Sequence, residues 1–241
     1  VISMIFTATL IAEGSGLVIN GISRGRAAEN SCFDLYFGIE GTEQDPGPYL
    51  DYIAENIPVE KSVLYQIYLD TLPRIRDYVS SRAVYYHYNY NQDPILRWSD
   101  YAALRSIAGY PAAVPEPGRY LIHCMTYLEE PLRACGQPLT FGDVTLMPGS
   151  IYTEHFSQNF GVGNGYGYIL VVPDEAAEAL AVHHLAYAAQ TSRPVSAAQY
   201  DALAGIAARE YDKQRNPSGY GFVTTKANED AQAAVLTSLT V

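Results

Sequence analysis

The sequence has few lysines and no concentration of positive charge. Only three of its fifteen basic residues are lysine, and the other twelve are arginine. The 26 acidic residues give a formal net charge of −11, which disfavours binding along the phosphate backbone of a nucleic acid. Contact with an anionic membrane surface is disfavoured for the same reason. We therefore expect neither a nucleic acid nor a membrane as a partner.

Cysteine and histidine are also sparse, and their spacing predicts no metal site. The three cysteines form no CxxC pair, and the five histidines show no HxH or HxxxH spacing. The adjacent His183 and His184 would point in different directions on a helix. An odd number of cysteines argues against a disulfide framework, although a single bridge between Cys124 and Cys135 would fit an oxidising compartment.

No uninterrupted apolar run is long enough to span a membrane, which takes about 18 residues. The opening "VISMIFTATLIAEGSG" resembles the apolar core of a signal peptide but lacks its positively charged start. We expect a soluble chain, either cytoplasmic or secreted by a route that leaves no cleavable signal.

Tyrosine is abundant, with 21 residues among 241, and it favours both sheets and binding surfaces. Patterning predicts one compact α+β domain over 1–241, with a mixed, mostly antiparallel sheet and a helical lobe over 48–115. A capping box at Ser196 and Gln199 begins one expected helix, and Ser99 is a candidate N-cap of another. The expected strands are 2–11, 16–22, 83–91, 119–128, 165–172 and 220–225. The expected helices are 48–57, 59–81, 98–109, 174–190, 196–214 and 227–238.

The stretch "ENSCFDLYFG" places Cys32 where a helix could begin, and a helix N-terminus lowers the pKa of a thiol. The aromatic residue after the cysteine resembles papain-like proteases, with His155 and Asn159 or Asn164 as later partners. A cysteine hydrolase is therefore one hypothesis. A small buried core residue is the simpler interpretation of Cys32.

Several segments resemble mono-ADP-ribosyltransferases. "GFVTTKANEDAQAAV" (221–235) is similar to the family's NAD-clasping strand and the helix that follows it, where Glu229 is acidic. A second alignment, to pertussis-type toxins, uses "ISRGRAAENSCFDLYFGI" (22–39) as the first strand, with Arg24 or Arg26 as its NAD-binding arginine. In that alignment "GYGYILVV" (165–172) resembles the central strand, and "ALAGIAAREYDKQRNPSGYGFVTT" (202–225) resembles the segment that carries the catalytic glutamate.

The second alignment implies an NAD-dependent transferase, a bacterial effector or toxin delivered into a host cell and acting on a protein. Arg24 would bind NAD, Ser150 of "LMPGSIYT" would shape the nicotinamide pocket, and Glu210 would stabilise the oxocarbenium-like transition state. Ala208 stands where arginine-modifying members carry a second glutamate, so the acceptor is expected not to be arginine. The alternative is a non-enzymatic interaction protein or virion-type structural protein that uses Tyr-rich strands such as 83–91.

Overall fold

The computed structural model describes residues 32–40, 45–70, 75, 78, 79, 93–154, 167–214 and 221–225. Their strands are β1 (Leu35–Glu40), β2 (Val59–Asp70), β3 (Asp93–Arg97), β4 (Arg119–Cys124), β5 (Leu139–Phe141), β6 (Val144–Tyr152), β7 (Tyr168–Val172), β8 (Val182–Thr191) and β9 (Gly221–Thr225). Their helices are α2 (Gly47–Asn56), α4 (Trp98–Ile107), the 3₁₀ turn η1 (Thr126–Leu128), α5 (Glu129–Cys135), α6 (Asp174–Ala177) and α7 (Ala197–Gln214).

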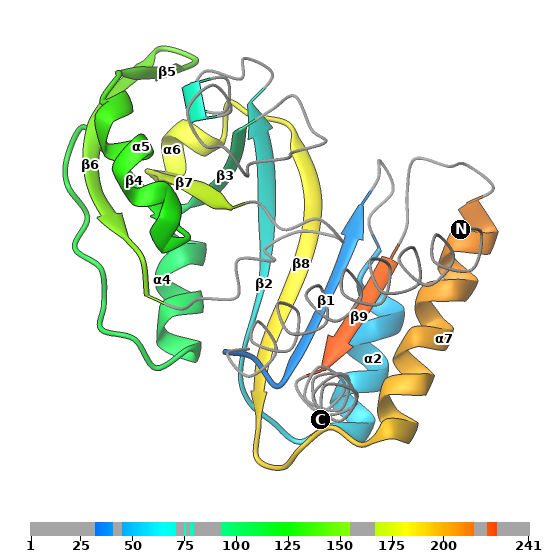
Figure 1. The fold of residues 1–241 in the computed structure, drawn as a ribbon. Helices are drawn as coiled ribbons and strands as arrows, with labels where there is room; N and C mark the ends of the chain where they lie inside the picture. Colours follow the sequence, from blue (N-terminus) through cyan, green and yellow to red (C-terminus); the bar gives the residue numbers. More distant parts are fainter. Residues whose placement is uncertain are drawn as a thin grey trace, which may run out of the picture.

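The strands join in the order β5-β6-β4-β7-β3-β2-β8-β1-β9 (Figure 1). Neighbouring strands run antiparallel except in two pairs, β3 with β7 and β4 with β6. The α+β class and the mixed, mostly antiparallel sheet expected from the sequence are therefore confirmed.

One half of the sheet consists of two interleaved βαβ units. β1 and β2 each pair antiparallel with β8, so they run parallel to each other, and α2 connects them. β8 and β9 each pair antiparallel with β1, and α7 connects them. This is the split βαβ arrangement of ferredoxin-like sheets. The chain between β2 and β8 supplies β3 to β7, which extend the sheet beyond β2; we call these strands and their helices the inserted half.

Alternate residues of the central strands bury one face of the sheet under α2 and α7, which lie side by side in Figure 1. On this face the ring of Phe37 stacks on Tyr49 of α2 at 4.6 Å and on Tyr187 of β8 at 5.1 Å. Tyr49 and Ile53 are four residues apart, so they occupy one side of α2 and both reach the sheet.

The other residues of β1 and β8, which alternate with those under α2 and α7, point to the opposite face of the sheet, where α4 packs. Tyr36, Ala186 and Ala188 join Tyr101 and Leu104 of α4 in this second core. Both faces of the central strands are thus covered, which explains why β8 is an almost continuous apolar run rather than an alternating one.

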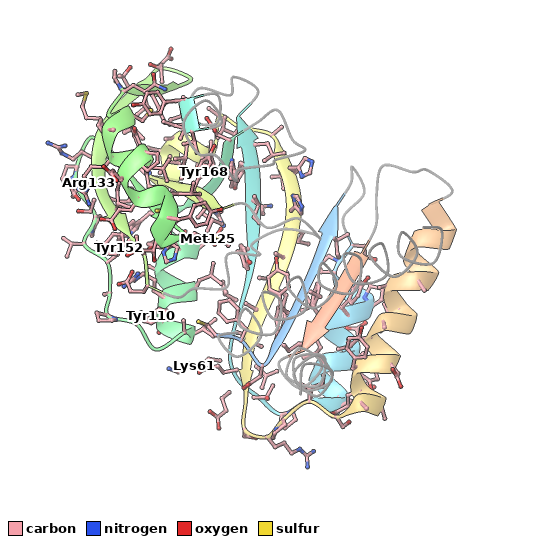
Figure 2. All side chains as sticks on the ribbon, in the orientation of Figure 1. Lys61, Tyr110, Met125, Arg133, Tyr152 and Tyr168 are labelled. Atoms are coloured by element: carbon pink, nitrogen blue, oxygen red, sulfur yellow. The ribbon has the colours of Figure 1, made fainter. Side chains whose placement is uncertain are left out.

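The inserted half has its own core between its strands and the helix α5. Within it the side chain of Asp93 is buried, and its carboxylate accepts the Tyr168 hydroxyl at 2.5 Å and the Ile75 N–H at 3.1 Å. Tyr168, labelled in Figure 2, lies in the interior of this half. These hydrogen bonds join β3 to β7 and to Ile75. They also compensate the cost of burying the Asp93 carboxylate.

Two helix predictions are wrong. Residues 59–70 form β2 in the middle of the sheet, although Leu64, Ile67 and Tyr68 follow helical spacing. The expected helix 174–190 ends after α6, and the chain then forms β8. In both segments a strand with two buried faces carries apolar residues at consecutive positions, and such a run resembles a buried helix. The region 48–115 accordingly contains β2 and β3 as well as α2 and α4.

Other predictions are confirmed with adjusted ends. α2, α4 and α7 form where helices were expected, and β4, β7 and β9 lie within three expected strands. The capping box is present: the Ser196 hydroxyl accepts the Gln199 N–H, and the Gln199 side chain accepts the Ser196 N–H at 2.8 Å. Ser99 is no N-cap, because α4 already begins at Trp98. The expected strands 2–11, 16–22 and 83–91 and the helix 227–238 lie outside the described residues.

Two further corrections concern Cys32 and the adjacent histidines. Cys32 does not begin a helix but precedes β1. The bridge between Cys124 and Cys135, which the sequence left open, is not formed, and both residues are free cysteines. His183 and His184 lie on a strand, and their Nδ1 atoms contact each other instead of diverging. Among the described helices, none has the length and apolar character needed to cross a bilayer.

Candidate functional site

A cavity of about 500 Å³ lies at one edge of the inserted half, outside the carboxyl ends of β3 and β7. We call it the Trp98 cavity. Its floor consists of Leu121, Val171 and Val172, which are buried strand residues. Trp98, the only tryptophan of the chain, forms part of its wall. An apolar cavity with a few convergent polar groups is the usual form of a ligand site.

Local sequence explains why these residues meet. β3 and β7 are parallel neighbours, with Arg97 opposite Val172, so both strands end at the same edge of the sheet. Each is followed at once by a helix, α4 beginning at Trp98 and α6 at Asp174. Ligands of open sheets with parallel strands bind in such a crevice at the carboxyl ends.

The remaining wall is the loop before β4, "PEPGR" (115–119), which is stiffened by two prolines. Its Glu116 accepts the Ser150 N–H at 3.0 Å and the Ser150 hydroxyl at 2.5 Å, and its backbone carbonyl accepts the Arg119 N–H at 3.1 Å. The Arg119 guanidinium donates to the Pro148 carbonyl at 2.6 Å. The loop is thereby fastened to β6 on both sides of Gly149.

The lining carries more negative than positive charge. Glu116, Asp174 and Glu175 face a single cation, Arg119, which pairs with Glu116 at 3.6 Å. Asp174 also accepts the Ser99 N–H of the first turn of α4 at 3.0 Å. A carboxylate therefore already occupies the helix N-terminus that would otherwise attract an anion.

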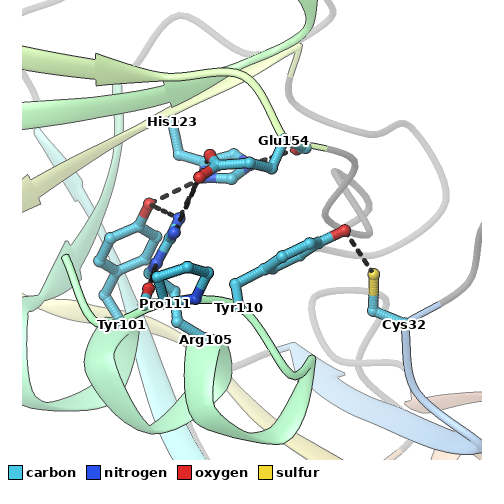
Figure 3. Close-up of polar contacts among 7 residues, drawn as sticks. All are labelled: Cys32, Tyr101, Arg105, Tyr110, Pro111, His123 and Glu154. Carbon is cyan, nitrogen blue, oxygen red and sulfur yellow. Dashed lines mark hydrogen bonds and ion pairs between the residues drawn. The ribbon is translucent and has the colours of Figure 1, made fainter.

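The indole of Trp98 lies next to Tyr101, a member of a buried polar cluster that links α4 to β4 and to the chain after β6. Its ring lies 6.2 Å from that of Tyr101, tilted by 59°. The Tyr101 hydroxyl accepts from Arg105 at 3.2 Å, and Arg105 binds both carboxylate oxygens of Glu154, at 2.8 and 3.3 Å (Figure 3). We call Tyr101, Arg105, His123 and Glu154 the Arg105 cluster.

Arg105 is only 1% exposed, yet its charge is well satisfied. Besides Glu154 and Tyr101, its Nε donates to the Pro111 carbonyl at 2.8 Å, and its guanidinium lies 4.8 Å above the centre of the Tyr152 ring. One side chain thus joins α4, the loop after it and the end of β6. Such a two-pronged guanidinium–carboxylate pair fixes direction as well as distance.

His123 completes the cluster. Its Nε2 lies 3.2 Å from the Glu154 carbonyl, which can only accept, so Nε2 carries a hydrogen. Its Nδ1 shares a hydrogen bond with the Tyr101 hydroxyl at 2.8 Å. Burial raises the pKa of Tyr101, which keeps the hydroxyl protonated at neutral pH. The hydrogen bonds from Arg105 lower the pKa of Glu154, which is therefore ionised.

Cys32 lies beside this cluster without belonging to it. Its Sγ is 3.6 Å from the Tyr110 hydroxyl, and burial, together with this hydrogen bond, raises the pKa of Tyr110 to about 12 (Figure 3). The hydrolase hypothesis paired Cys32 with His155 and Asn159 or Asn164, which lie outside the described residues. The described neighbour of the Cys32 thiol is the Tyr110 hydroxyl. Because Cys32 precedes a strand, no helix begins at this residue to lower the pKa of its thiol.

The structure does not bring Ser150 and Glu210, the two predicted transferase residues that it describes, to the same part of the sheet. Arg24 lies outside the described residues. Ser150 is on β6, beside the Trp98 cavity, whereas Glu210 is in α7, which packs against β9 and α2. Six strands lie between β6 and β9. At about 4.8 Å per strand-to-strand step, β6 and β9 are roughly 34 Å apart across the sheet.

Sequence reasoning missed the Trp98 cavity, although both of its strand ends carry a signal. "PILRWSD" and "YILVVPDE" each run from apolar residues directly into a helix start with a carboxylate. Within the described residues, no group of three His, Cys, Asp or Glu side chains is placed to hold a metal ion. Comparison of the chain with models of protein families finds no match, and comparison with curated proteins finds no significant similarity.

Proposed function

We propose that this chain is a recognition module that binds a positively charged organic group, a guanidinium or an ammonium on an apolar stem, in the Trp98 cavity. The observation that carries the proposal is the combination of one indole, an apolar floor and three carboxylates around about 500 Å³. This function belongs to the non-enzymatic interaction class.

The indole and two of the carboxylates in the lining favour a cation. The face of an indole attracts a cation by about 0.5–2 kcal/mol, depending on how far the cation is desolvated. Glu175 is exposed, and Asp174 uses one oxygen for the Ser99 N–H, so carboxylate oxygens remain to accept N–H groups. The formal net charge of −11 adds a long-range attraction for cations.

The same lining disfavours phosphate. A dinucleotide such as NAD would bring its pyrophosphate against three carboxylates, and the N-terminus of α4 is already capped by Asp174. The lining therefore does not suit NAD. The proposed site discriminates in two ways, because it attracts cations and repels anions.

The fluorescence of Trp98 can report binding in the cavity, because Trp98 is the only tryptophan of the chain. We expect N-acetylarginine amide to change Trp98 fluorescence in a saturable manner, and N-acetylcitrulline amide, which has the same shape without the charge, to have little effect. Added salt should weaken binding. Equal responses to the two compounds, or no response to either, would contradict the proposal.

Glu175→Gln should weaken the binding of N-acetylarginine amide by roughly two- to fivefold, since an exposed charge contributes up to about 1 kcal/mol. Glu55→Gln is the matched control, because Glu55 is an exposed glutamate on α2 in the other half of the sheet. An equal loss in both variants would indicate a general charge effect rather than a contact in the cavity.

A transferase activity is a separate hypothesis, and one observation bears on it: the Ser150 hydroxyl is bonded to the cavity residue Glu116. Release of nicotinamide from NAD, measured with the unaltered chain and with Glu210→Gln, tests it directly. Turnover that Glu210→Gln abolishes would support it. Turnover that the substitution leaves unchanged, or no turnover with protein acceptors present, would remove Glu210 from consideration.

A further inference from the structure

Two exposed apolar side chains belong to residues that adjoin the lining of the Trp98 cavity, one in the loop before β4 and one on β6. Val114, directly before the lining residue Pro115, is 69% exposed. Met147, on β6, is 50% exposed. Its N–H donates to the carbonyl of the lining residue Gly118 at 2.9 Å, and it stands opposite Arg119 in the β4–β6 ladder. We call Val114 and Met147 the rim.

A free amine as ligand would not explain why Val114 and Met147 are exposed beside the cavity lining. A small cation that fills the cavity would leave both side chains in water. A polypeptide would cover them, because residues next to an anchoring side chain lie outside the cavity. Protein interfaces commonly combine a central anchor in a pocket with surrounding apolar contacts that exclude water.

We propose that the cation is an arginine or lysine side chain of a partner protein, presented in an extended segment whose neighbouring residues are apolar and cover Val114 and Met147. This inference rests on the proposed function of the cavity and names the source of its ligand. Complementarity of charge supports it, because the lining has three carboxylates to one guanidinium.

The loop is organised in advance for such a partner. Glu116 holds Ser150, Arg119 holds the Pro148 carbonyl at 2.6 Å, and prolines at 115 and 117 limit the backbone between them. Little conformational freedom is then lost when a segment binds, and this lowers the entropic cost of association. The indole of Trp98 lies against the ring of Tyr101, with the ring centres 6.2 Å apart.

Three probes separate the sources of the cation: N-acetylarginine amide, acetyl-Ala-Leu-Arg-Leu-Ala-amide and acetyl-Ala-Ser-Arg-Ser-Ala-amide. Trp98 fluorescence should report binding of all three. We expect the leucine peptide to bind about tenfold more tightly than the serine peptide, because it buries apolar area on the rim. Equal affinities of the two peptides would overturn the inference while leaving the cation site intact.

Val114→Ser and Met147→Ser test the same contacts from the protein's side. Both side chains are exposed, so the fold should be kept, which circular dichroism can check. The double variant should lose the advantage of the leucine peptide and retain its affinity for N-acetylarginine amide. An unchanged advantage would overturn the inference. If N-acetylarginine amide itself fails to bind the unaltered chain, the proposed function fails, and this inference fails with it.

Discussion

Arg105 and Glu154 form a two-pronged ion pair that joins α4 to the end of β6, with N–O distances of 2.8 and 3.3 Å. The guanidinium is 1% exposed and the carboxylate 36%. The cation therefore depends on its partner for compensation more than the carboxylate does. The pair lies behind Tyr101 and hence behind the indole of the cavity.

Glu154→Gln should lower the free energy of unfolding by about 3 kcal/mol, because it leaves a buried guanidinium without its counter-charge. Denaturation with urea measures the change. Glu129→Gln is the control: it removes the same charge from the solvent-exposed pair with Arg133, where the N–O distance is 2.9 Å. That loss should stay below about 1 kcal/mol. Similar losses in the two variants would show that burial of the Arg105 guanidinium does not increase the contribution of its ion pair to stability.

Acid should destabilise the fold partly through Glu154. The Arg105 hydrogen bonds lower the pKa of this carboxyl in the folded state, below the unfolded value of about 4.3. The resulting stability is fully present above the unfolded pKa and is lost as pH falls through the folded pKa. Unfolding measured from neutral pH down to about pH 3 should therefore show a smaller decline for Glu154→Gln than for the unaltered chain. Identical slopes would contradict this assignment.

Asp174 has two roles that different substitutions separate. Asp174→Asn keeps an oxygen for the Ser99 N–H, so stability should change little, whereas affinity for N-acetylarginine amide should fall roughly threefold. Asp174→Ala should lose the cap as well and cost about 1 kcal/mol. Thermal unfolding and Trp98 titration distinguish the two. Equal stability of the two variants would show that the hydrogen bond to α4 contributes nothing.

Gly149 is required where β6 passes β4. A Cβ there would lie 2.9 Å from the Tyr120 carbonyl oxygen and 3.1 Å from Leu121 Cδ2. Gly149→Ala should cost about 1–3 kcal/mol, since backbone would have to move, and it should also weaken cation binding by shifting the loop that Ser150 holds.

The control for this substitution is Gly109→Ala, where nothing lies within 4 Å and the backbone angle φ of +77° is the only source of strain. It should cost about 1 kcal/mol and leave cation binding unchanged. A loss of affinity in Gly109→Ala as large as that in Gly149→Ala would contradict the proposed role of the β4–β6 contact.

Local signals predicted the elements whose own residues decide their conformation. The capping box before α7 acts within a few residues, and that helix forms as expected. β2 and β8 were missed because their apolar residues serve two packed faces, and the number of covered faces depends on distant segments. The transferase resemblance linked Ser150 with Glu210, and the order of strands then separated them.

By itself, the sequence determined the acidic charge, the α+β class and the helices that begin with strong local signals, since these follow from composition and short-range bonds. Only the tertiary structure decided that β3 and β7 lie side by side and parallel, because strand pairing is a contact between residues about 75 positions apart. That pairing brings Trp98 and Asp174 to one edge and places the "PEPGR" loop across it. The cavity, its excess of negative charge and its apolar rim exist only once those segments have met.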